Sequence, residues 1–322
     1  MNSERVVKNP LITFVILGYK HAEFIKSAIE GALAQHYSPL EIILSDDCSP
    51  DDTYQIMEEM AESYQGPHSI ILNRNETNQG IAEHLNRIGQ MMKGDFLVIS
   101  AGDDISMPDR TSAIFEEWDN NRKQVDLVYS AAMEIDEQGN DLFLRDEAFV
   151  RQNLPQKDAR ELLRKNSFAL GATCAISQRI FREFPPLMPA LICEDHAWPL
   201  RARLRGGDIV YIDKPLVRHR CGGMGTRLPA GVRLLDYQQK LIDIQSQDNS
   251  KDLVKICRDY LSYWSLLTAK RNGRFREESA KYTKSRLCWI GWTWGVRVLK
   301  RKLGLREIAR RFFPSNRRRK SA

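Results

Sequence analysis

The first 130 residues alternate short apolar runs with segments of helical periodicity. The run Leu11–Leu17 is almost entirely apolar, which is typical of a strand buried on both faces of a parallel sheet. Residues 22–35 then repeat apolar side chains at helical spacing. Further strands are predicted at 41–44, 69–72, 95–100 and 125–130, and further helices at 53–64, 81–92 and from Pro108 to about Asn120. This alternation on short connections predicts an α/β fold, a mostly parallel sheet flanked by helices.

Beyond residue 130 the alternation fades. The turn sequence at 137–141 predicts a hairpin, and residues 158–166 have a helical pattern. Residues 167–226 are expected to be rich in loops, whereas 231–322 indicate helices rich in Trp, Tyr and Arg. We therefore expect an α/β catalytic domain at 1–226 and a helical, basic C-terminal extension at 227–322.

Polar side chains follow three of the predicted strands. Tyr19 comes after the first strand, Asp46 and Asp47 end the second, and Asp103 and Asp104 end the fourth. Ligands of such sheets bind beyond the carboxyl ends of the strands. A carboxylate pair there can hold Mg²⁺ or Mn²⁺, which would bridge the phosphates of a nucleotide. Asp is also common in turns and helix N-caps, so a purely structural role stays open.

A third acidic cluster, Glu194-Asp195-His196, lies in the loop-rich segment. One carboxylate can take the proton of an attacking hydroxyl group, and Glu194 could orient the loop or raise the pKa of its neighbour. The alternative is an acidic cluster at a helix N-terminus, which the helix dipole favours.

Taken together, these segments resemble a family 2 glycosyltransferase of the bacterial surface-polysaccharide type, with the GT-A fold. The resemblance spans roughly residues 11–226, and its specificity comes from the order of many short motifs. The matching stretches are 14–19, 41–49, 78–80, 94–104, 171–175, 193–196 and 215–220.

The resemblance implies a role for each strand-end residue. Tyr19 would lie against the nucleobase, and Asp47 would bond the base with support from Asp46. Asp103 would contact the ribose or a metal-bound water, and Asp104 would ligate Mn²⁺ or Mg²⁺.

The resemblance also implies an inverting reaction with Asp195 as the catalytic base, beside Glu194. One carboxylate suffices for that chemistry, because a metal-bound diphosphate leaves without the second acid that glycosidases use.

Two stretches depart from the family pattern. The family often has Asp-x-Asp at the fourth strand end, where this chain has Ala101 in place of the first acid. Many members also carry Tyr-Arg-x-His near the diphosphate, and here the segment is Arg218-His219-Arg220. Arg220 or Arg218 is therefore expected to contact phosphate, and whether His219 contacts the metal or the diphosphate stays open.

The charge of the chain is unevenly distributed. Residues 285–322 hold twelve Lys or Arg and one acid, so this tail carries a net charge of +11 and the rest of the chain −5. Aromatic residues between the basic ones suit an anionic membrane surface. Six widely spaced cysteines, without a signal-peptide pattern or a long apolar run, favour a cytoplasmic chain that is peripheral on the inner face of the plasma membrane.

We therefore expect transfer of a sugar from a nucleoside-diphosphate donor, of the UDP or dTDP type, to a saccharide acceptor. The acceptor is expected to be lipid-linked, in capsule, O-antigen or related polysaccharide assembly, and nucleic acid is not expected as a partner. One alternative is a nucleotidyltransferase that makes the nucleotide-sugar, although only Gly18 and Lys20 resemble its phosphate loop. Another is a non-enzymatic nucleic-acid-binding protein that uses the tail and has a steep salt dependence.

Overall fold

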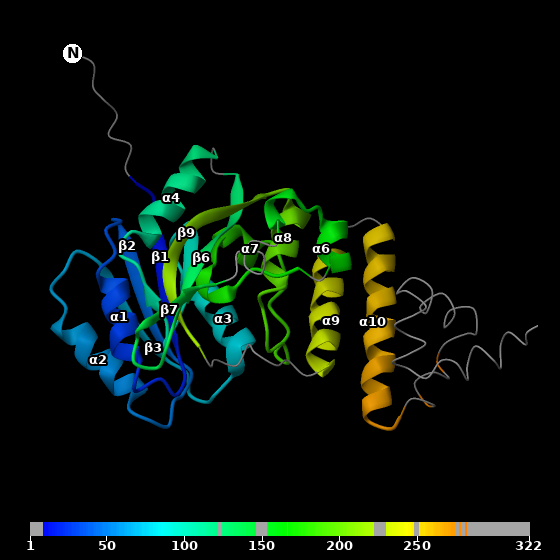
Figure 1. Cartoon of the computed structure of the whole chain (residues 1–322), viewed down its shortest axis with the longest axis horizontal. Helices are drawn as coiled ribbons and strands as arrows, with labels where there is room; N and C mark the ends of the chain where they lie inside the picture. Colours follow the sequence, from blue (N-terminus) through cyan, green and yellow to red (C-terminus); the bar gives the residue numbers. More distant parts are fainter. Residues whose placement is uncertain are drawn as a thin grey trace, which may run out of the picture.

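The expected α/β fold is confirmed by the computed structural model (Figure 1). It describes residues 9–121, 124–145, 153–165, 167–221, 230–247 and 251–274, together with 277 and 281. Nine strands form one sheet in the order β3-β2-β1-β4-β8-β6-β9-β5, and β7 pairs with β6. The pairs β3·β2, β2·β1, β1·β4 and β6·β9 are parallel. The sheet is therefore mixed only where β8, β5 and β7 join it.

The N-terminal half follows the predicted alternation closely. Its elements are β1 (Ile12–Gly18), α1 (Ile25–Leu33), β2 (Leu40–Asp46), α2 (Thr53–Ser63), β3 (Ser69–Arg74), α3 (Gly80–Met91), β4 (Phe96–Ala101), β5 (Ile105–Ser106) and α4 (Arg110–Asn120). Every residue of β1 and β2 is buried, as expected for central strands covered on both faces. The carboxyl ends of β1, β2 and β4 therefore lie side by side.

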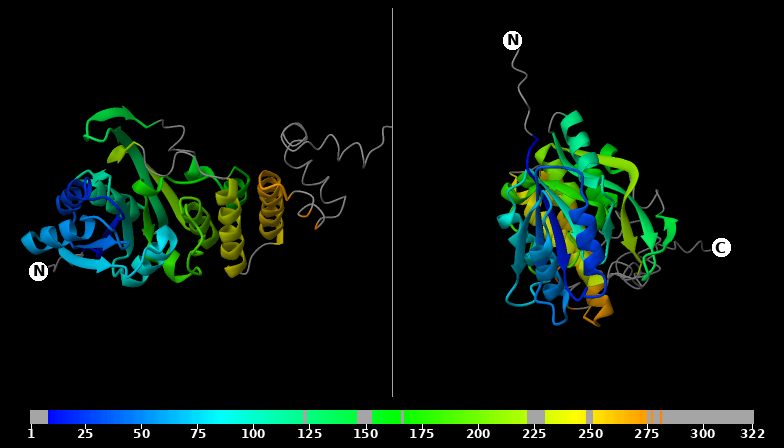
Figure 2. Two further views of the ribbon diagram at one scale, coloured as in Figure 1. Left: turned by 90° about the horizontal axis from the view of Figure 1, so that it is seen from below. Right: turned by 90° about the vertical axis from the view of Figure 1, so that its left-hand side faces the viewer.

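The second half adds a hairpin and a long strand. Its elements are β6 (Val125–Ile135), β7 (Asp141–Leu144), η1 (Leu154–Gln156), α6 (Ala159–Lys165), η2 (Gly171–Thr173), β8 (Ala175–Ser177), α7 (Gln178–Arg182), α8 (Ala197–Arg205) and β9 (Asp208–Arg220). The predicted hairpin is present as β6–β7, and it projects from the body of the molecule (Figure 2).

The expectation that residues 167–226 are mainly loop is wrong where α8 and β9 lie. The pairing of β9 with β6 shifts register around Pro215, so the apolar alternation is interrupted in the sequence although the strand continues. Proline lacks the N–H needed for a ladder hydrogen bond and is tolerated at such irregularities. Helix α8 is not evident from the sequence pattern, because it is short and rich in arginine and buries Arg201 along with Trp198.

The hydrophobic core lies on both faces of the sheet. One cluster packs α3, α7 and α8 against one face, and its members include Leu85, Ile180 and Trp198. A second packs α1, α2 and α4 against the other face, with Ile29 and Trp118 among its members. Two apolar layers thus hold the strands rigid beneath their polar ends.

Helices α9 (Ala230–Ser246) and α10 (Lys251–Arg271) lie in the predicted helical extension and confirm helices there as far as residue 271. They stand side by side beyond α6 and α8, at the end of the molecule opposite α2 (Figure 1). A buried ion pair fastens α9 to α8, because Arg201 Nη2 and Nε lie 2.8 and 3.0 Å from the carboxylate oxygens of Asp243. Both side chains are almost completely buried.

The basic tail at 285–322 lies outside the described residues, so the predicted membrane contact concerns a part that the structure does not describe. Within the part that it does describe, no helix combines the length and apolar character needed to cross a bilayer. Among the cysteines placed there, Cys174 and Cys257 are buried, whereas Cys221 is exposed.

The buried pair predicts how the C-terminal helices contribute to stability. Asp243→Ala leaves the Arg201 guanidinium buried without its carboxylate and is expected to lower the free energy of unfolding by about 3 to 5 kcal/mol. The double change Arg201→Met with Asp243→Leu removes both charges and is expected to recover most of that loss. Urea denaturation followed by circular dichroism measures both. If Asp243→Ala unfolds only a separate minor transition, α9 is not part of the main cooperative unit.

Candidate active site

The loops that follow β1, β2 and β4 are tied to one another by backbone and side-chain hydrogen bonds. The Asp47 N–H donates to Gly18 O at 2.9 Å, and the Gly102 N–H donates to Leu17 O at 2.9 Å. From the β2 loop, Ser49 Oγ accepts the N–H of Lys20 at 3.0 Å. The three strand ends therefore form one connected edge of the sheet.

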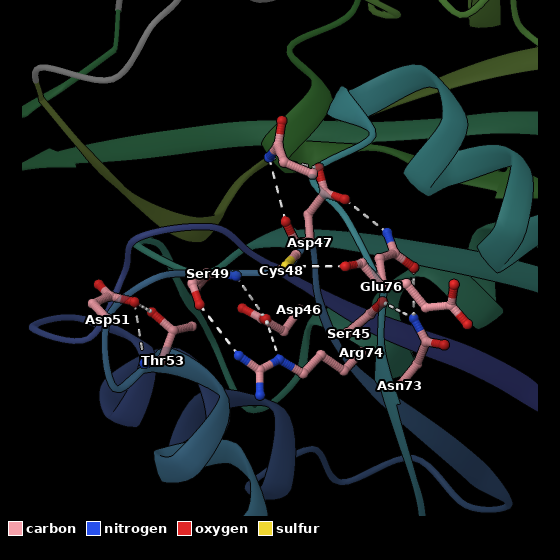
Figure 3. A network of polar contacts seen from close by, with 12 residues as sticks. Ser45, Asp46, Asp47, Cys48, Ser49, Asp51, Thr53, Asn73, Arg74 and Glu76 are labelled. Atoms are coloured by element: carbon pink, nitrogen blue, oxygen red, sulfur yellow. Dashed lines mark hydrogen bonds and ion pairs between the residues drawn. The ribbon is translucent and has the colours of Figure 1, made fainter.

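Asp46 is fully buried at the end of β2. Its Oδ2 accepts the N–H of Ser49 at 2.9 Å and lies 3.6 Å from Nε of Arg74 (Figure 3). The Arg74 guanidinium in turn stacks on the Tyr54 ring at 4.8 Å. Asp46 Oδ1 has no hydrogen-bond partner among the described residues. Asp46 thus shapes the turn after β2, and its predicted support of a nucleobase contact stays a prediction.

Asp47 accepts four hydrogen bonds through its carboxylate. Oδ1 receives Asn75 Nδ2 at 2.7 Å and the Gln79 N–H at 2.9 Å. Oδ2 receives Asn78 Nδ2 at 3.0 Å and the Gly80 N–H at 2.8 Å. This carboxylate closes the N-terminus of α3, where the helix dipole favours negative charge. A nucleobase N–H would have to share an oxygen with these donors, so the predicted base contact stays a prediction.

Tyr19 and Lys20 stand at the end of β1. Tyr19 is 38 % exposed, and Nζ of Lys20 lies 5.2 Å from the centre of its ring. Lys20 has a positive φ of 60°, which turns the chain sharply after the strand. The Tyr19 ring is therefore accessible to a planar ligand, as its predicted role requires.

Asp103 and Asp104 follow β4 on a tight turn. Gly102 leaves no room for a side chain, because a Cβ there would lie 2.5 Å from Nδ1 of His21. Asp104 is buried, and its Oδ1 accepts the N–H of Arg220 at 2.9 Å. Asp103 is partly buried. The pair thus joins the end of β4 to the end of β9.

Arg220 is held by backbone oxygens. Its Nε donates to Asp103 O at 3.0 Å, and its Nη1 donates at 2.5 Å to Asp136 O and Glu137 O. The guanidinium also stacks on the Phe24 ring at 4.3 Å. Arg220 therefore braces the acidic turn, and direct contact with phosphate stays a prediction.

His219 and Arg218 are both paired with carboxylates. Nδ1 of His219 lies 3.2 Å from Oε2 of Glu134, and Nη2 of Arg218 lies 2.8 Å from Oδ1 of Asp141. Glu134 also binds Arg145 at 2.5 Å and accepts from the thiol of Cys221 at 3.0 Å. A polar cluster thus fills the end of β9 beside Asp104.

Glu194 and Asp195 form a coupled acidic pair just before α8, and their carboxyl groups share a hydrogen bond. Gly171 closes over them, since a Cβ there would lie 2.3 Å from Oδ1 of Asp195 and 3.0 Å from Oε1 of Glu194. The Ala169 N–H also donates to Asp195 O at 3.2 Å. The glycine turn therefore holds both carboxyl groups in place.

Burial makes the two acidic centres reluctant to ionise. Burial raises the pKa of Asp104 to about 7, with a further increase from Asp103, while His219 and the Arg220 N–H oppose it. Burial raises the pKa of Glu194 as well. Burial, followed by the neighbouring Glu194, holds the pKa of Asp195 well above its usual range, and a hydrogen bond from Gly171 partly offsets this. Carboxyl groups with a pKa displaced in this way are frequent at catalytic sites.

The Asp103–Asp104 turn has the chemistry of a divalent-cation site. Mg²⁺ and Mn²⁺ prefer oxygen ligands, and one or two carboxylates commonly share such an ion with substrate phosphates. A buried carboxylate whose pKa is raised also gains from a nearby positive charge. No group of three or more His, Cys, Asp or Glu side chains in the described part is arranged to hold a metal alone. The two carboxylates therefore fit an ion that a diphosphate would help to bind.

Arg110 is a site residue that the sequence analysis did not identify. It is completely buried in the first turn of α4, although an arginine there ordinarily points into solvent. Gly171 lay within a motif already noted, but the single sequence gave no sign that it touches Asp195.

A mixed α/β sheet whose strand ends present an acidic turn, with a further carboxyl pair just before α8, is typical of GT-A transferases. The model of the family described as Glycosyl transferase family 2 matches residues 13–184, more than half of the chain. The chain belongs to this family, which confirms the resemblance inferred from its motifs.

Relatives cover different shares of the chain. An uncharacterized glycosyltransferase MJ1057 of Methanocaldococcus jannaschii is 24% identical over 66% of this chain and 71% of its own length. The succinoglycan biosynthesis protein ExoO of Rhizobium meliloti is 28% identical over 69% of this chain and 60% of its own length. A match to a chondroitin synthase of Escherichia coli is 28% identical and covers 44% of this chain but only 20% of the length of that enzyme.

Solved structures agree on the fold. TarS 1-349 of S. aureus has a TM-score of 0.57 at 15% identity, and the match covers 85% of this chain and 73% of that one. The mannosyltransferase PcManGT from Pyrobaculum calidifontis, in complex with GDP-Man and Mn²⁺, has a TM-score of 0.54 at 15% identity. That match covers 88% of this chain and 84% of PcManGT.

The raised pKa of Asp195 predicts a cost in stability. A carboxyl group with a higher pKa in the folded chain binds its proton more tightly there, so stability is fullest below the ordinary pKa near 4 and falls as pH rises through the folded-state value. Asp195→Asn removes this loss and is expected to melt at a higher temperature than the wild type at pH 8. The difference should shrink at pH 5, as measured by calorimetry across pH. If Asp195→Asn melted at a lower temperature than the wild type at pH 8, the raised pKa of Asp195 would be contradicted.

Proposed function

We propose that this glycosyltransferase transfers a sugar, with inversion, from a nucleoside-diphosphate donor to a hydroxyl group of a saccharide. The observation that carries the proposal is the presence of two separate acidic centres. Asp103 and Asp104 stand at the end of β4, and the Glu194–Asp195 pair lies under Gly171 before α8. One centre suits the diphosphate and the other suits the attacking hydroxyl.

The carboxyl pair provides the base. Direct displacement at the anomeric carbon requires a group that takes the acceptor proton as its oxygen attacks. Asp195 is assigned this role, since burial raises the pKa of its carboxyl and a carboxylate with a raised pKa accepts a proton more readily than an exposed one. Burial and, after it, the neighbouring Glu194 keep the pKa of Asp195 high, and Gly171 fixes the position of the Asp195 carboxyl group.

The strand-end edge provides the donor site. The partly exposed Tyr19 ring offers a stacking surface for the nucleobase, and the hydrogen bond from the Lys20 N–H to Ser49 Oγ ties the loops after β1 and β2 together beside it. Asp104, with Asp103, would hold Mn²⁺ or Mg²⁺ against the diphosphate, where such an ion supplies positive charge for the departing group. Arg220 and Asp104 keep that turn in place through the hydrogen bond between them.

The acceptor is proposed to belong to a growing surface polysaccharide. ExoO is a succinoglycan biosynthesis protein, and the chondroitin synthase match is also to an enzyme of polymer synthesis. The basic, aromatic tail would bring the enzyme to the inner face of the plasma membrane, where a lipid-linked acceptor is available. UDP or dTDP is the proposed nucleotide of the donor, and PcManGT, bound to GDP-Man, is the reason to test GDP as well.

Donor and metal binding can be tested together by thermal shift. Nucleotide-sugars with UDP, dTDP or GDP are added to the wild type with and without Mn²⁺, and stabilisation is expected for one nucleotide class only when Mn²⁺ is present. Asp104→Asn is expected to lose the Mn²⁺-dependent part, whereas Asp213→Asn, on the exposed part of β9, serves as the matched control. Equal stabilisation of wild type and Asp104→Asn would count against the proposed donor site.

The base can be tested by its pH dependence. Asp195→Asn is expected to bind the donor normally but to lose about a hundredfold or more in the rate of nucleoside-diphosphate release. Glu194→Gln removes the adjacent negative charge, which lowers the pKa of Asp195, so the acid side of the pH–rate profile should move to lower pH. A profile that stays in place in Glu194→Gln would remove Glu194 from this role.

A further inference from the structure

The Arg110 guanidinium is hydrogen-bonded both to β4, which leads to the Asp103–Asp104 turn, and to the η2 turn beside Asp195. Among the described residues, Arg110 forms no ion pair with a carboxylate. Its guanidinium is completely buried below the strand ends, and its charged group bonds neutral backbone and hydroxyl oxygens. Burying a cation without a bonded carboxylate is costly, so the arrangement calls for an explanation beyond stability.

The hydrogen bonds of Arg110 connect two parts of the site. Nη2 donates to Ile99 O of β4 at 2.8 Å and to Ala172 O of the η2 turn at 2.9 Å, and it lies 3.3 Å from Cys174 O. Nη1 donates to Ser106 Oγ at 2.9 Å. Strand β4 leads into the turn that holds Asp103 and Asp104, so the guanidinium joins the strand before the donor centre to the η2 turn.

The η2 turn leads directly to the base. The Cys174 N–H donates to Gly171 O at 2.9 Å, which closes the turn, and the Gly171 backbone bonds the carboxylate of Asp195. No side chain larger than hydrogen fits between Gly171 and the carboxyl pair. Because this closed turn packs directly against the carboxyl pair, a shift of the Ala172 and Cys174 carbonyls also shifts the carboxylate of Asp195.

We propose that Arg110 is a positioning residue that fixes the separation between the donor-side turn at Asp103–Asp104 and the base Asp195. Its guanidinium holds the carbonyls of β4 and η2 at one distance. This inference rests on the proposed function, because it takes Asp195 as the base and the Asp103–Asp104 turn as the donor site. An arginine suits the task, since its planar fork presents several N–H donors in fixed directions, whereas a lysine is a single flexible point charge.

The positive charge of Arg110 also acts on the Asp103–Asp104 turn. Arg110 and Asp104 influence each other electrostatically, the cation favouring the ionised carboxylate. Burial lowers the pKa of Arg110 to about 10, which leaves it protonated at neutral pH. Arg110→Lys keeps this charge but loses the fork, so it separates the positioning contribution from the electrostatic one.

The test compares Arg110→Lys with Arg201→Lys, a matched control. Arg201 is equally buried, bonds Pro185 O and Asp243, and has no bond to the η2 turn. For each full-length variant, calorimetry gives the melting temperature and titration gives the Kd of the donor selected by the thermal-shift screen, in the presence of Mn²⁺. The rate of nucleoside-diphosphate release at saturating donor, with water as the acceptor, gives kcat.

Arg110→Lys is expected to lower kcat about a hundredfold while the donor Kd changes by less than about threefold, because a misplacement of about 1 Å has such an effect on a reacting pair. Arg201→Lys is expected to lose melting temperature but to keep kcat within about threefold of the wild type. The inference is overturned if the two variants lose kcat equally, or if Arg110→Lys loses donor affinity in proportion to kcat.

Ser106→Ala carries the same test should Arg110→Lys not fold. It removes the acceptor of Nη1 and leaves the guanidinium charge in place. A drop of about tenfold in kcat at unchanged donor Kd supports the inference, and an unchanged kcat overturns it. A wild type that releases no diphosphate from any donor would instead reject the proposed function, so the two failures are distinguishable.

Discussion

The structure depends on keeping several carboxylates out of water at one edge of a sheet. Each buried carboxylate loses hydration, and that loss must be offset by hydrogen bonds or by positive charge. Around Asp47 the offset is complete, with two backbone N–H groups and two asparagine amides on one carboxylate. Around Asp104 and Asp195 it is incomplete, and the pKa of both side chains is raised.

This difference separates the acids that build the site from those available for chemistry. Asp46 and Asp47 serve the loops after β2 and β3 and close the N-terminus of α3. The negative charge of Asp104 and of Asp195 is incompletely compensated by the protein, so a bound cation or a proton would stabilise either carboxylate. Helix α3 connects the two groups, because Asn86, six residues after Gly80, makes two hydrogen bonds with the backbone of Leu187 in the segment that leads to Asp195.

Much of the fold could be predicted because the evidence for it is local. The apolar runs at β1 and β2 and the helical periodicity between them follow directly from burial on both faces. Strand β9 could not be recognised, since its pairing shifts register at Pro215. The acids after β2 and β4 were predicted from their positions at strand ends, and the Glu194–Asp195 pair from a loop cluster that resembles the family. The ionisation of each carboxylate depends on partners distant in sequence. Arg110 was missed for the same reason, because its partners Ala172 and Cys174 lie about sixty residues away.

The domain boundary predicted at 226/227 follows a change in composition. Helix α9, which lies beyond it, contacts the segment that leads to Glu194 and Asp195. Gln239 of α9 accepts the N–H of Met188 at 2.6 Å, at the start of the segment that ends in Glu194 and Asp195. Burial lowers the pKa of His196 to about 4, and nearby Asp236 of α9 opposes that shift. Helix α9 thus contacts the segment that leads to Asp195 through Gln239, although it lies outside the matched family region of 13–184. The boundary drawn from composition at 226/227 therefore does not separate the proposed base from the C-terminal helices.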